Sequence, residues 1–330
     1  MRKVYSILAL SLLVWLMSGC EKVIDVDPSA SKPKVVLVSD VRPDSTLAFK
    51  LTYSRFFLDN RAFRNISGAT VSLKVNDTLS PYTFSEDNGL YTSAFVPRVG
   101  DKLRIEVATP AGEQVEAETV VPDEPSLGDL SAVYVGRYSD GLRYALRFTI
   151  TDPEGDNYYC LRVRRCDTVV EPYTRYDHDH DTTIVTYDTT VRDNYIEFSC
   201  NDYALTSSSG VDIGAVLDGS EASVGEILFF TDRFFSGAEH EVSLNINNYY
   251  SGVYDYGDSV SHGTPLSVSF EVELTSFSYD RFMHEQTLAA YNNDIFEGLF
   301  SEPVQIYSNI KNGIGIFAGR AKQTIRATVR

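Results

Sequence analysis

The stretch of this sequence that carries the most chemistry is Tyr176-Asp-His-Asp-His-Asp181, where two imidazoles and three carboxylates fall within six residues. Imidazole is a preferred ligand of Zn²⁺, Ni²⁺ and Cu²⁺, so His178, His180 and Asp179 are candidate metal ligands. In an extended chain the two histidines lie on one face and the acids on the other, so a chelate requires a bend. The alternative is an exposed acidic loop without a metal.

A second candidate site lies in the segment Asn247-Asn-Tyr-Tyr-Ser-Gly-Val-Tyr-Asp-Tyr-Gly-Asp258. Exposed tyrosines beside Asn, Gly and Asp combine stacking area with adaptable hydrogen bonds, as sites for carbohydrates and peptides need. The sequence therefore predicts a ligand-binding surface formed by four tyrosines, Tyr249, Tyr250, Tyr254 and Tyr256. The alternative is that these side chains occupy alternate buried positions of a strand.

The segment Asp152-Pro-Glu-Gly-Asp-Asn157 gathers carboxylates around a glycine, as calcium loops do, but it lacks the spacing and terminal Glu of an EF-hand. Its Asp-Pro and Gly-Asp pairs are also ordinary turn chemistry. The sequence contains no G-x-S-x-G, H-E-x-x-H or P-loop signature. We therefore expect neither an enzyme nor a cofactor, with a hydrolase that uses paired carboxylates as the alternative.

Three cysteines remain besides Cys20, namely Cys160, Cys166 and Cys200. Cys160 and Cys166 fall on one predicted strand, where six residues separate them by roughly 20 Å, far beyond the reach of a disulfide. A disulfide would therefore involve Cys200 or a bent strand. The alternative is that all three are free, buried thiols.

The N-terminus has the features of a bacterial lipoprotein leader. Arg2 and Lys3 precede an apolar run from Val4 to Leu16, and Ser18-Gly19 leads directly into Cys20. The apolar run is shorter than the roughly 20 residues that a membrane-spanning helix needs. A cysteine in this position resembles the lipobox, in which the thiol is acylated and the preceding bond is cleaved.

We therefore expect residues 1–19 to be a signal peptide, Cys20 to carry lipid that anchors the chain to a membrane, and residues 20–34 to form a flexible tether. The formal net charge of −17 becomes more negative when the leader, which is basic, is removed. Such an excess of negative charge repels phosphates, so nucleic acid is not an expected partner.

The remainder of the sequence predicts a mainly β fold. Residues 35–122 alternate apolar and polar positions, which favours an immunoglobulin-like β-sandwich, although the Cys, Trp and Cys framework of antibody domains is missing. Two prolines around two acids, Pro122 to Pro125, mark a boundary. Residues 126–330 predict a larger antiparallel β domain, with one packed helix over Ser278 to Asn292. The same alternation predicts strands at 47–53, 71–75, 103–107, 113–121, 142–150, 159–163, 183–187, 195–200, 227–231, 242–246 and 266–274.

Several segments together resemble one known family. They are the leader, GATVSL at Gly68–Leu73, NGLYTS at Asn88–Ser93, DPEGDNYY at Asp152–Tyr159, FFTDRFFSG at Phe229–Gly237 and DIFEGLFSEPVQIYSNIKNGIGIFAGR at Asp294–Arg320. The chain is similar in these motifs to the Bacteroidota lipoproteins with domain of unknown function 4249 (DUF4249). The resemblance implies an outer-membrane-associated lipoprotein, often encoded beside TonB-dependent receptors, and it implies no reaction, cofactor or catalytic residue. Independently, Gly313 and Gly315 within an apolar run predict a bulge or a close backbone approach in a late strand.

The function predicted from these features is that of a lipid-anchored outer-membrane protein. It would act as a non-enzymatic accessory or ligand-binding component beside a TonB-dependent transporter, with a glycan or a peptide as ligand. Exposure at the cell surface is favoured over the periplasmic face. A hydrolase of surface polymers and a structural or adhesive surface protein are the alternatives.

Overall fold

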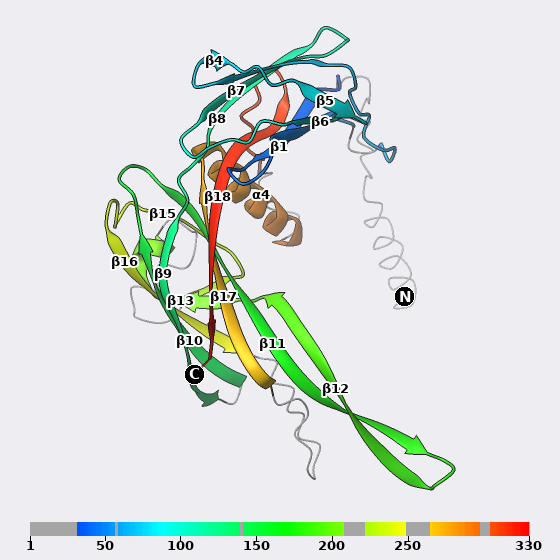
Figure 1. Cartoon of the computed structure of the whole chain (residues 1–330), viewed down its shortest axis with the longest axis vertical. Coiled ribbons are helices and arrows are strands. Elements are labelled where there is room, and N and C mark those ends of the chain that lie inside the picture. Colours follow the sequence, from blue (N-terminus) through cyan, green and yellow to red (C-terminus); the bar gives the residue numbers. More distant parts are fainter. Residues whose placement is uncertain are drawn as a thin grey trace, which may run out of the picture. The chain divides into compact units, whose positions relative to one another are not determined.

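The computed structural model describes residues 32–56, 59–138, 141–207, 222–248, 265–297 and 304–329. The chain divides into two compact units, the first comprising Met1–Pro33 and Arg55–Ala62 and the second comprising Lys34–Ser54 and Phe63–Arg330. The second unit contains every strand and helix described below, and its elements are labelled in Figure 1.

The described residues form a mainly β structure. Along most strands, buried positions alternate with more exposed ones, because successive side chains of a strand point to opposite faces of the sheet. The first strands are β1 (Val35–Val41), β2 (Ala48–Tyr53), β3 (Thr70–Val75), β4 (Thr78–Leu79), β5 (Phe84–Asp87), β6 (Leu90–Ser93), β7 (Lys102–Ala108) and β8 (Gln114–Val120). The following strands are β9 (Ser126–Tyr138), β10 (Gly141–Thr151), β11 (Tyr158–Asp177), β12 (Thr182–Tyr195) and β13 (Phe198–Cys200). The last are β14 (Ala222–Gly225), β15 (Leu228–Thr231), β16 (Glu239–Asn248), β17 (Pro265–Phe277) and β18 (Ile314–Thr328). The two helices among the described residues are α2 (Tyr203–Thr206) and α4 (Tyr279–Glu297).

The strands of the described residues make three sheets. A nine-stranded sheet has the order β12-β11-β17-β18-β1-β2-β6-β5, with β15 also paired to β11. A five-stranded sheet has the order β14-β13-β16-β10-β9, and a four-stranded sheet has the order β4-β3-β7-β8. The pairing is antiparallel except between β1 and β18, so the largest sheet is mixed.

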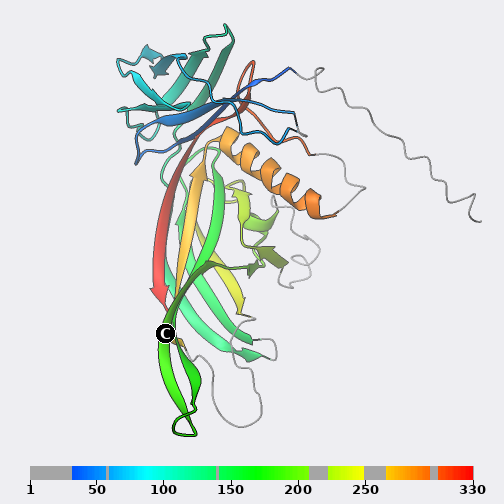
Figure 2. The same ribbon diagram turned by 90° about the vertical axis from the view of Figure 1, so that its right-hand side faces the viewer.

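The last strand connects the early and the late parts of the chain. The first half of β18 pairs in parallel with β1, from Val36 opposite Ile314 to Val41 opposite Gly319. Its second half pairs antiparallel with β17, from Phe277 opposite Arg320 onward. The long strand β18 is seen running past both groups of strands in Figures 1 and 2.

Two large apolar cores follow from this topology. One is built by early strands and includes Phe49 and Leu103, and Phe317 of β18 is buried in it as well. The other is built by late strands and includes Phe148 and Phe270. Because β18 supplies Phe317 to the first core, the early strands do not bury their apolar faces without the C-terminal part of the chain.

Helix α4 covers a smaller apolar cluster formed by Cys160, Phe277 and Phe282. The helix lies beside the long strands of the largest sheet (Figure 2). Its first turn is also held by charge, because Arg281 lies 3.7 Å from Asp40 of β1 and 2.6 Å from Glu285. None of the helices in the described part of the chain is both long enough and apolar enough to cross a bilayer.

The mainly β fold and the helix after Ser278 are confirmed, and α4 continues beyond the predicted end at Asn292. The predicted strand over 195–200 is wrong in one respect, because β12 ends at Tyr195 and β13 begins at Phe198. The late domain is not purely antiparallel, since β18 joins β1 in parallel. An immunoglobulin-like order of the early strands stays a prediction. A strand-free stretch, 121–125, lies at the predicted boundary between β8 and β9.

Candidate functional site

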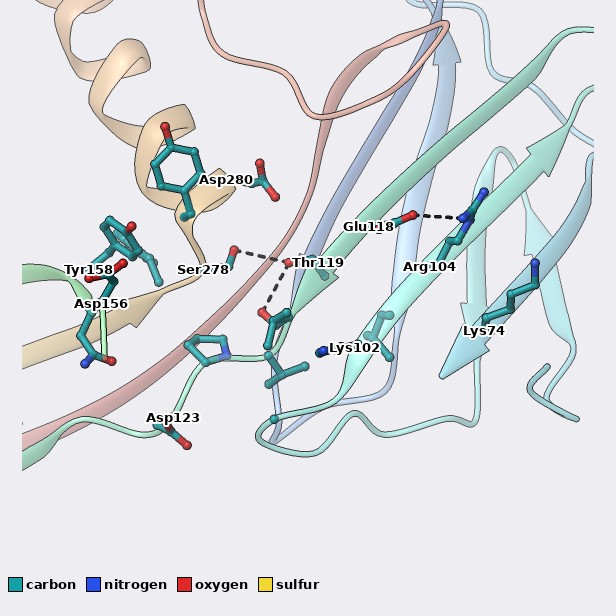
Figure 3. A pocket seen from close by; sticks show the side chains of 18 of the residues that line it. Lys74, Lys102, Arg104, Glu118, Thr119, Asp123, Asp156, Tyr158, Ser278 and Asp280 are labelled. Atoms are coloured by element: carbon teal, nitrogen blue, oxygen red, sulfur yellow. Dashed lines mark hydrogen bonds and ion pairs between the residues drawn. The ribbon is translucent and has the colours of Figure 1, made fainter. Parts of the chain in front are cut away.

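The described residues line a cavity of about 550 Å³ that is open to solvent, with a volume typical of small-molecule sites. It lies where four segments meet: the four-stranded sheet, the strand-free stretch 121–125, the loop between β10 and β11, and the start of α4. Figure 3 shows the side chains that line it. Segments from early and late parts of the sequence therefore build one cavity.

One wall of this cavity is basic. Lys74 of β3 and both Lys102 and Arg104 of β7 line it. The two β7 side chains face away from the core because the intervening Leu103 is buried. The Arg104 guanidinium is fixed 3.2 Å from the Glu118 carboxylate (Figure 3). Lys102 has no ion pair within the described residues, so its ammonium is available to a ligand.

The opposite wall is aromatic and acidic. Tyr158, at the start of β11, and Tyr279, at the start of α4, form an edge-to-face pair with ring centroids 5.4 Å apart. The Phe282 ring packs against Tyr158 with a distance of 5.2 Å between the ring centroids, whereas Tyr279 keeps 52% of its surface exposed. Asp156 lies beside Tyr158 and away from Lys74 in Figure 3. The two tyrosines thus form a supported apolar platform next to a hydrogen-bond acceptor.

The protonation of this wall is set by burial and neighbouring acids. Burial, and then the charge of Asp156, raises the pKa of Tyr158, so its hydroxyl stays a donor at neutral pH. Tyr307 donates a 2.5 Å hydrogen bond to Asp280. Burial and this carboxylate raise the pKa of Tyr307 far above its usual value. The hydrogen bond fixes the Asp280 carboxylate at the rim of the cavity.

A compact hydrogen-bond network forms the base. The Gly319 N–H donates to the hydroxyls of Thr119 and Ser278 at 3.0 and 3.2 Å, and the Ser278 N–H donates back to the Gly319 carbonyl at 3.0 Å. Figure 3 shows Thr119 and Ser278 facing each other. A side chain at Gly319 would meet the Val120 carbonyl oxygen at 2.5 Å. The close backbone approach at Gly319 therefore ties β8, β18 and the start of α4 together.

The loop that supplies Asp156 is held by internal hydrogen bonds. Asp152 is 5% exposed and accepts hydrogen bonds from the Tyr159 hydroxyl at 2.5 Å and the Gly237 N–H at 3.0 Å. Asn157 donates to the Asp232 carboxylate at 3.2 Å. Burial, together with the facing Asp232, raises the pKa of Asp152. Within the segment considered as a calcium loop, the Asp152 carboxylate is therefore occupied by protein donors.

These contacts also explain two motifs of the sequence. DPEGDNYY and FFTDRFFSG lie far apart in the chain, yet their residues Asp152 and Asp232 meet at this loop. Both carboxyl groups are nearly buried, at 5% and 4% exposure, so neither reaches a substrate. Their role is to shape the loop that carries Asp156.

The predicted metal ligands lie in the turn between β11 and β12. His180 pairs with Asp177 at 2.9 Å, and the His178 ring packs edge-on against Tyr176 at 5.0 Å. Within the described part of the chain, no group of three or more His, Cys, Asp or Glu side chains is arranged to hold a metal ion. The structure does not bring His178, His180 and Asp179 together as a ligand set.

The three predicted disulfide candidates are free thiols. Cys160 and Cys200 are buried, and burial raises their pKa to about 12 and about 11, respectively. Cys166 is partly exposed, and burial followed by the charge of Asp193 raises its pKa as well. Thiols protonated in this way are poor nucleophiles.

The remaining predicted site residues lie outside the described residues. They are the acylation site Cys20 and the tyrosines Tyr249, Tyr250, Tyr254 and Tyr256. The cavity itself was missed from sequence, because its walls come from strands, a loop and a helix that only the tertiary fold brings together. The signal that pointed toward it was the loop motif beginning at Asp152.

Comparison with known proteins identifies a family and a distant structural likeness. A family model described as "Domain of unknown function (DUF4249)" matches residues 21–326. The chain is also similar to Bacteroides ovatus mixed-linkage glucan utilization locus (MLGUL) SGBP-B, solved in complex with a mixed-linkage heptasaccharide, with 9% identity and a TM-score of 0.22. The match covers 62% of this chain and 50% of SGBP-B, so the chain spans about half the length of that protein. No curated protein matches the chain.

Proposed function

The chain belongs to the DUF4249 family, and from that premise we propose that it is a lipoprotein of the bacterial outer membrane, anchored through Cys20, that binds a ligand without catalysing a reaction. The basic and apolar leader that ends at Cys20 supports the anchor. Two or three acyl chains on one cysteine make such anchoring effectively permanent.

The observation that carries ligand binding is the cavity between Lys102 and the Tyr158–Tyr279 pair. An aromatic platform takes the apolar face of a sugar ring or of a peptide side chain. The Lys102 ammonium donates hydrogen bonds to such a ligand, and the Asp156 and Asp280 carboxylates accept them. A glycan or a peptide segment therefore fits the chemistry of both walls.

Binding is tested on the full chain, purified in detergent, against labelled glycan and peptide panels. We expect Tyr279→Ala and Asp156→Ala to weaken binding by roughly 5- to 30-fold, because a central contact contributes about 1–2 kcal/mol. Tyr82→Ala is a matched control, since Tyr82 is similarly exposed at 48% and does not line the cavity. Equal loss in the control, or no ligand in either panel, would refute binding at this cavity.

The accessory role is tested separately. We propose that the protein works beside a TonB-dependent transporter, as the family resemblance implies. A tagged chain should co-purify with such a receptor from solubilised outer membranes, and Cys20→Ser should abolish both lipid attachment and co-purification. Recovery of the lipidated chain without any receptor would remove the transporter from the proposal. Turnover of a panel ligand would show instead that the protein is a hydrolase.

A further inference from the structure

A second cavity, of about 660 Å³, lies in the late part of the chain and shares no residue with the first. Its lining comes from the middle of β11, the end of β12 with the two residues that follow it, the residue that follows β14, and the end of β16. Its charged and amide-bearing lining residues include Arg165, Asp167, Arg192, Glu197, Glu226 and Asn247. Nothing in the proposed function accounts for this cavity.

The cavity holds an ion pair that is almost completely removed from solvent. The Arg165 Nε donates to the Asp167 Oδ1 at 2.6 Å, and the two side chains are only 10% and 8% exposed. The guanidinium also lies 5.6 Å from the Tyr144 ring centroid, which helps to fix its orientation. Burying two charges costs free energy that one hydrogen bond does not fully repay, so a structural role alone explains the pair poorly.

The pair leaves hydrogen-bonding capacity unused. Its hydrogen bond engages Nε of Arg165 and one oxygen of Asp167, and neither side chain has another such partner within the described residues. The two terminal guanidinium nitrogens and the second carboxylate oxygen therefore remain for a ligand in the cavity they line. The two terminal guanidinium nitrogens of Arg165 beside the free carboxylate oxygen of Asp167 can hydrogen-bond to two neighbouring hydroxyl groups of a ligand.

An independent observation concerns Asn247. Its side-chain oxygen is buried and accepts no hydrogen bond from the described residues, although Asn247 lines the same cavity. A buried acceptor without a partner costs about 1–3 kcal/mol, and native proteins rarely leave one unpaired. A ligand hydroxyl would satisfy it.

From these features we infer that this cavity is a second binding site, for a neutral polyhydroxylated ligand such as one or two sugar units. The positive charge of Arg165 and the negative charge of Asp167 cancel, so the pair offers hydrogen-bond donors and acceptors but no net charge to a ligand. The other charged lining residues, Arg192, Glu197 and Glu226, leave an excess of negative charge. An anionic ligand is disfavoured by that excess and by the net charge of −17, whereas a sugar hydroxyl both donates and accepts.

The test uses saturation-transfer NMR on the full chain in detergent. Methyl glucoside, cellobiose and maltose serve as neutral probes, and glucuronate and glycylglycine serve as charged probes. We expect at least one neutral probe to bind and to bind about tenfold more weakly to Arg165→Lys, which keeps the charge but loses the planar fork. Arg326→Lys is the matched control, because Arg326 pairs with Ser269 in the same sheet and does not line the cavity.

Because substitution of a buried ion pair can prevent folding, Asn247→Ala provides a second variant. It removes an acceptor that makes no hydrogen bond, so it should weaken the same probe while the thermal midpoint stays unchanged. Tyr279→Ala is measured in parallel to remove any binding of the same sugar at the first cavity, and the signal that this variant keeps should be the signal that Arg165→Lys and Asn247→Ala weaken. Binding that is lost in Tyr279→Ala but kept in Arg165→Lys and Asn247→Ala would place the sugar in the first cavity and overturn this inference. A response to the charged probes alone, or to none, would also overturn it, and would leave peptide binding at the first cavity unaffected.

Discussion

Replacing Gly315 with alanine tests the parallel pairing that joins the two ends of the chain. Gly315 lies in β18 opposite Leu37 of β1, with a φ of +117°. An L side chain in this region costs about 1–3 kcal/mol of backbone strain. Its Cβ would also overlap the Leu37 carbonyl oxygen and lie 2.9 Å from the carbonyl carbon, atoms of a strand that cannot simply move aside. Such overpacking costs about 1–3 kcal/mol more.

The expected total is therefore about 2–6 kcal/mol, or roughly 5–15 °C in thermal midpoint for a chain of this size. Three other glycines separate the two contributions. Gly112→Ala, at φ +89° with no atom within 4 Å, tests strain alone, and Gly313→Ala, whose Cβ would lie 2.8 Å from the Val35 carbonyl oxygen, tests crowding alone. Gly128→Ala, with its nearest atom at 3.5 Å, should be close to neutral.

Thermal unfolding followed by far-ultraviolet circular dichroism gives the four midpoints in parallel. The expected order of destabilisation is Gly315→Ala greatest, Gly313→Ala and Gly112→Ala intermediate, and Gly128→Ala least. If the thermal midpoint of Gly315→Ala is as high as that of Gly128→Ala, the pairing of Leu37 with Gly315 is refuted. Since that register also places Phe317 in the early core, the arrangement of β18 would fall with it.

Three further predictions concern charge, thiols and the helix. Burial alone would raise the pKa of Asp40, but the two 2.7 Å hydrogen bonds from Arg320 and nearby guanidinium charge outweigh burial and lower it. The charged Asp40 carboxylate therefore stabilises the fold above about pH 4, the pKa of an Asp in the unfolded chain, and this stabilisation is lost as the pH falls through the lower folded pKa. We expect Asp40→Asn to reduce the fall of the thermal midpoint at acid pH, as measured by thermal unfolding at a series of pH values. Cys160 and Cys200, with pKa about 12 and about 11, should stay unmodified by iodoacetamide at neutral pH and react after unfolding, as peptide mapping would show; labelling of the native protein would contradict their burial. Phe282→Ala should cost about 3–5 kcal/mol, because the ring is 4% exposed, and should free α4 for hydrogen exchange before the sheets; uniform exchange would argue against local packing.

Most elements of the fold are predictable from local pattern. Alternation of apolar and polar residues identifies β7, where Leu103 and Ile105 are buried and Arg104 faces outward. The spacing after Ser278 identifies α4. Gly313 and Gly315 correctly predict a close backbone approach, since the missing side chains mark where two backbones meet. These signals are local because the period of a strand or helix is written in neighbouring residues.

Which residues come together in a site is less visible in the sequence. The turn with His178 and His180 has metal-ligand chemistry, and in the structure His180 pairs with Asp177 while His178 packs against Tyr176. The buried pair Arg165–Asp167 looks in sequence like any charged strand segment, because burial depends on which sheet faces it. Pattern reveals residue types and faces, whereas a site depends on which distant faces meet.

By itself, the sequence determined the membership of the DUF4249 family, the mainly β composition, the positions of most strands and the long helix α4. Only the tertiary structure decided that β18 would join β1 in parallel and β17 antiparallel. That junction sets Thr119, Ser278 and Gly319 against one another and creates the first cavity. The physical reason is that strand periodicity specifies which face is buried but not the partner that covers it, a choice made by packing between residues far apart in the chain.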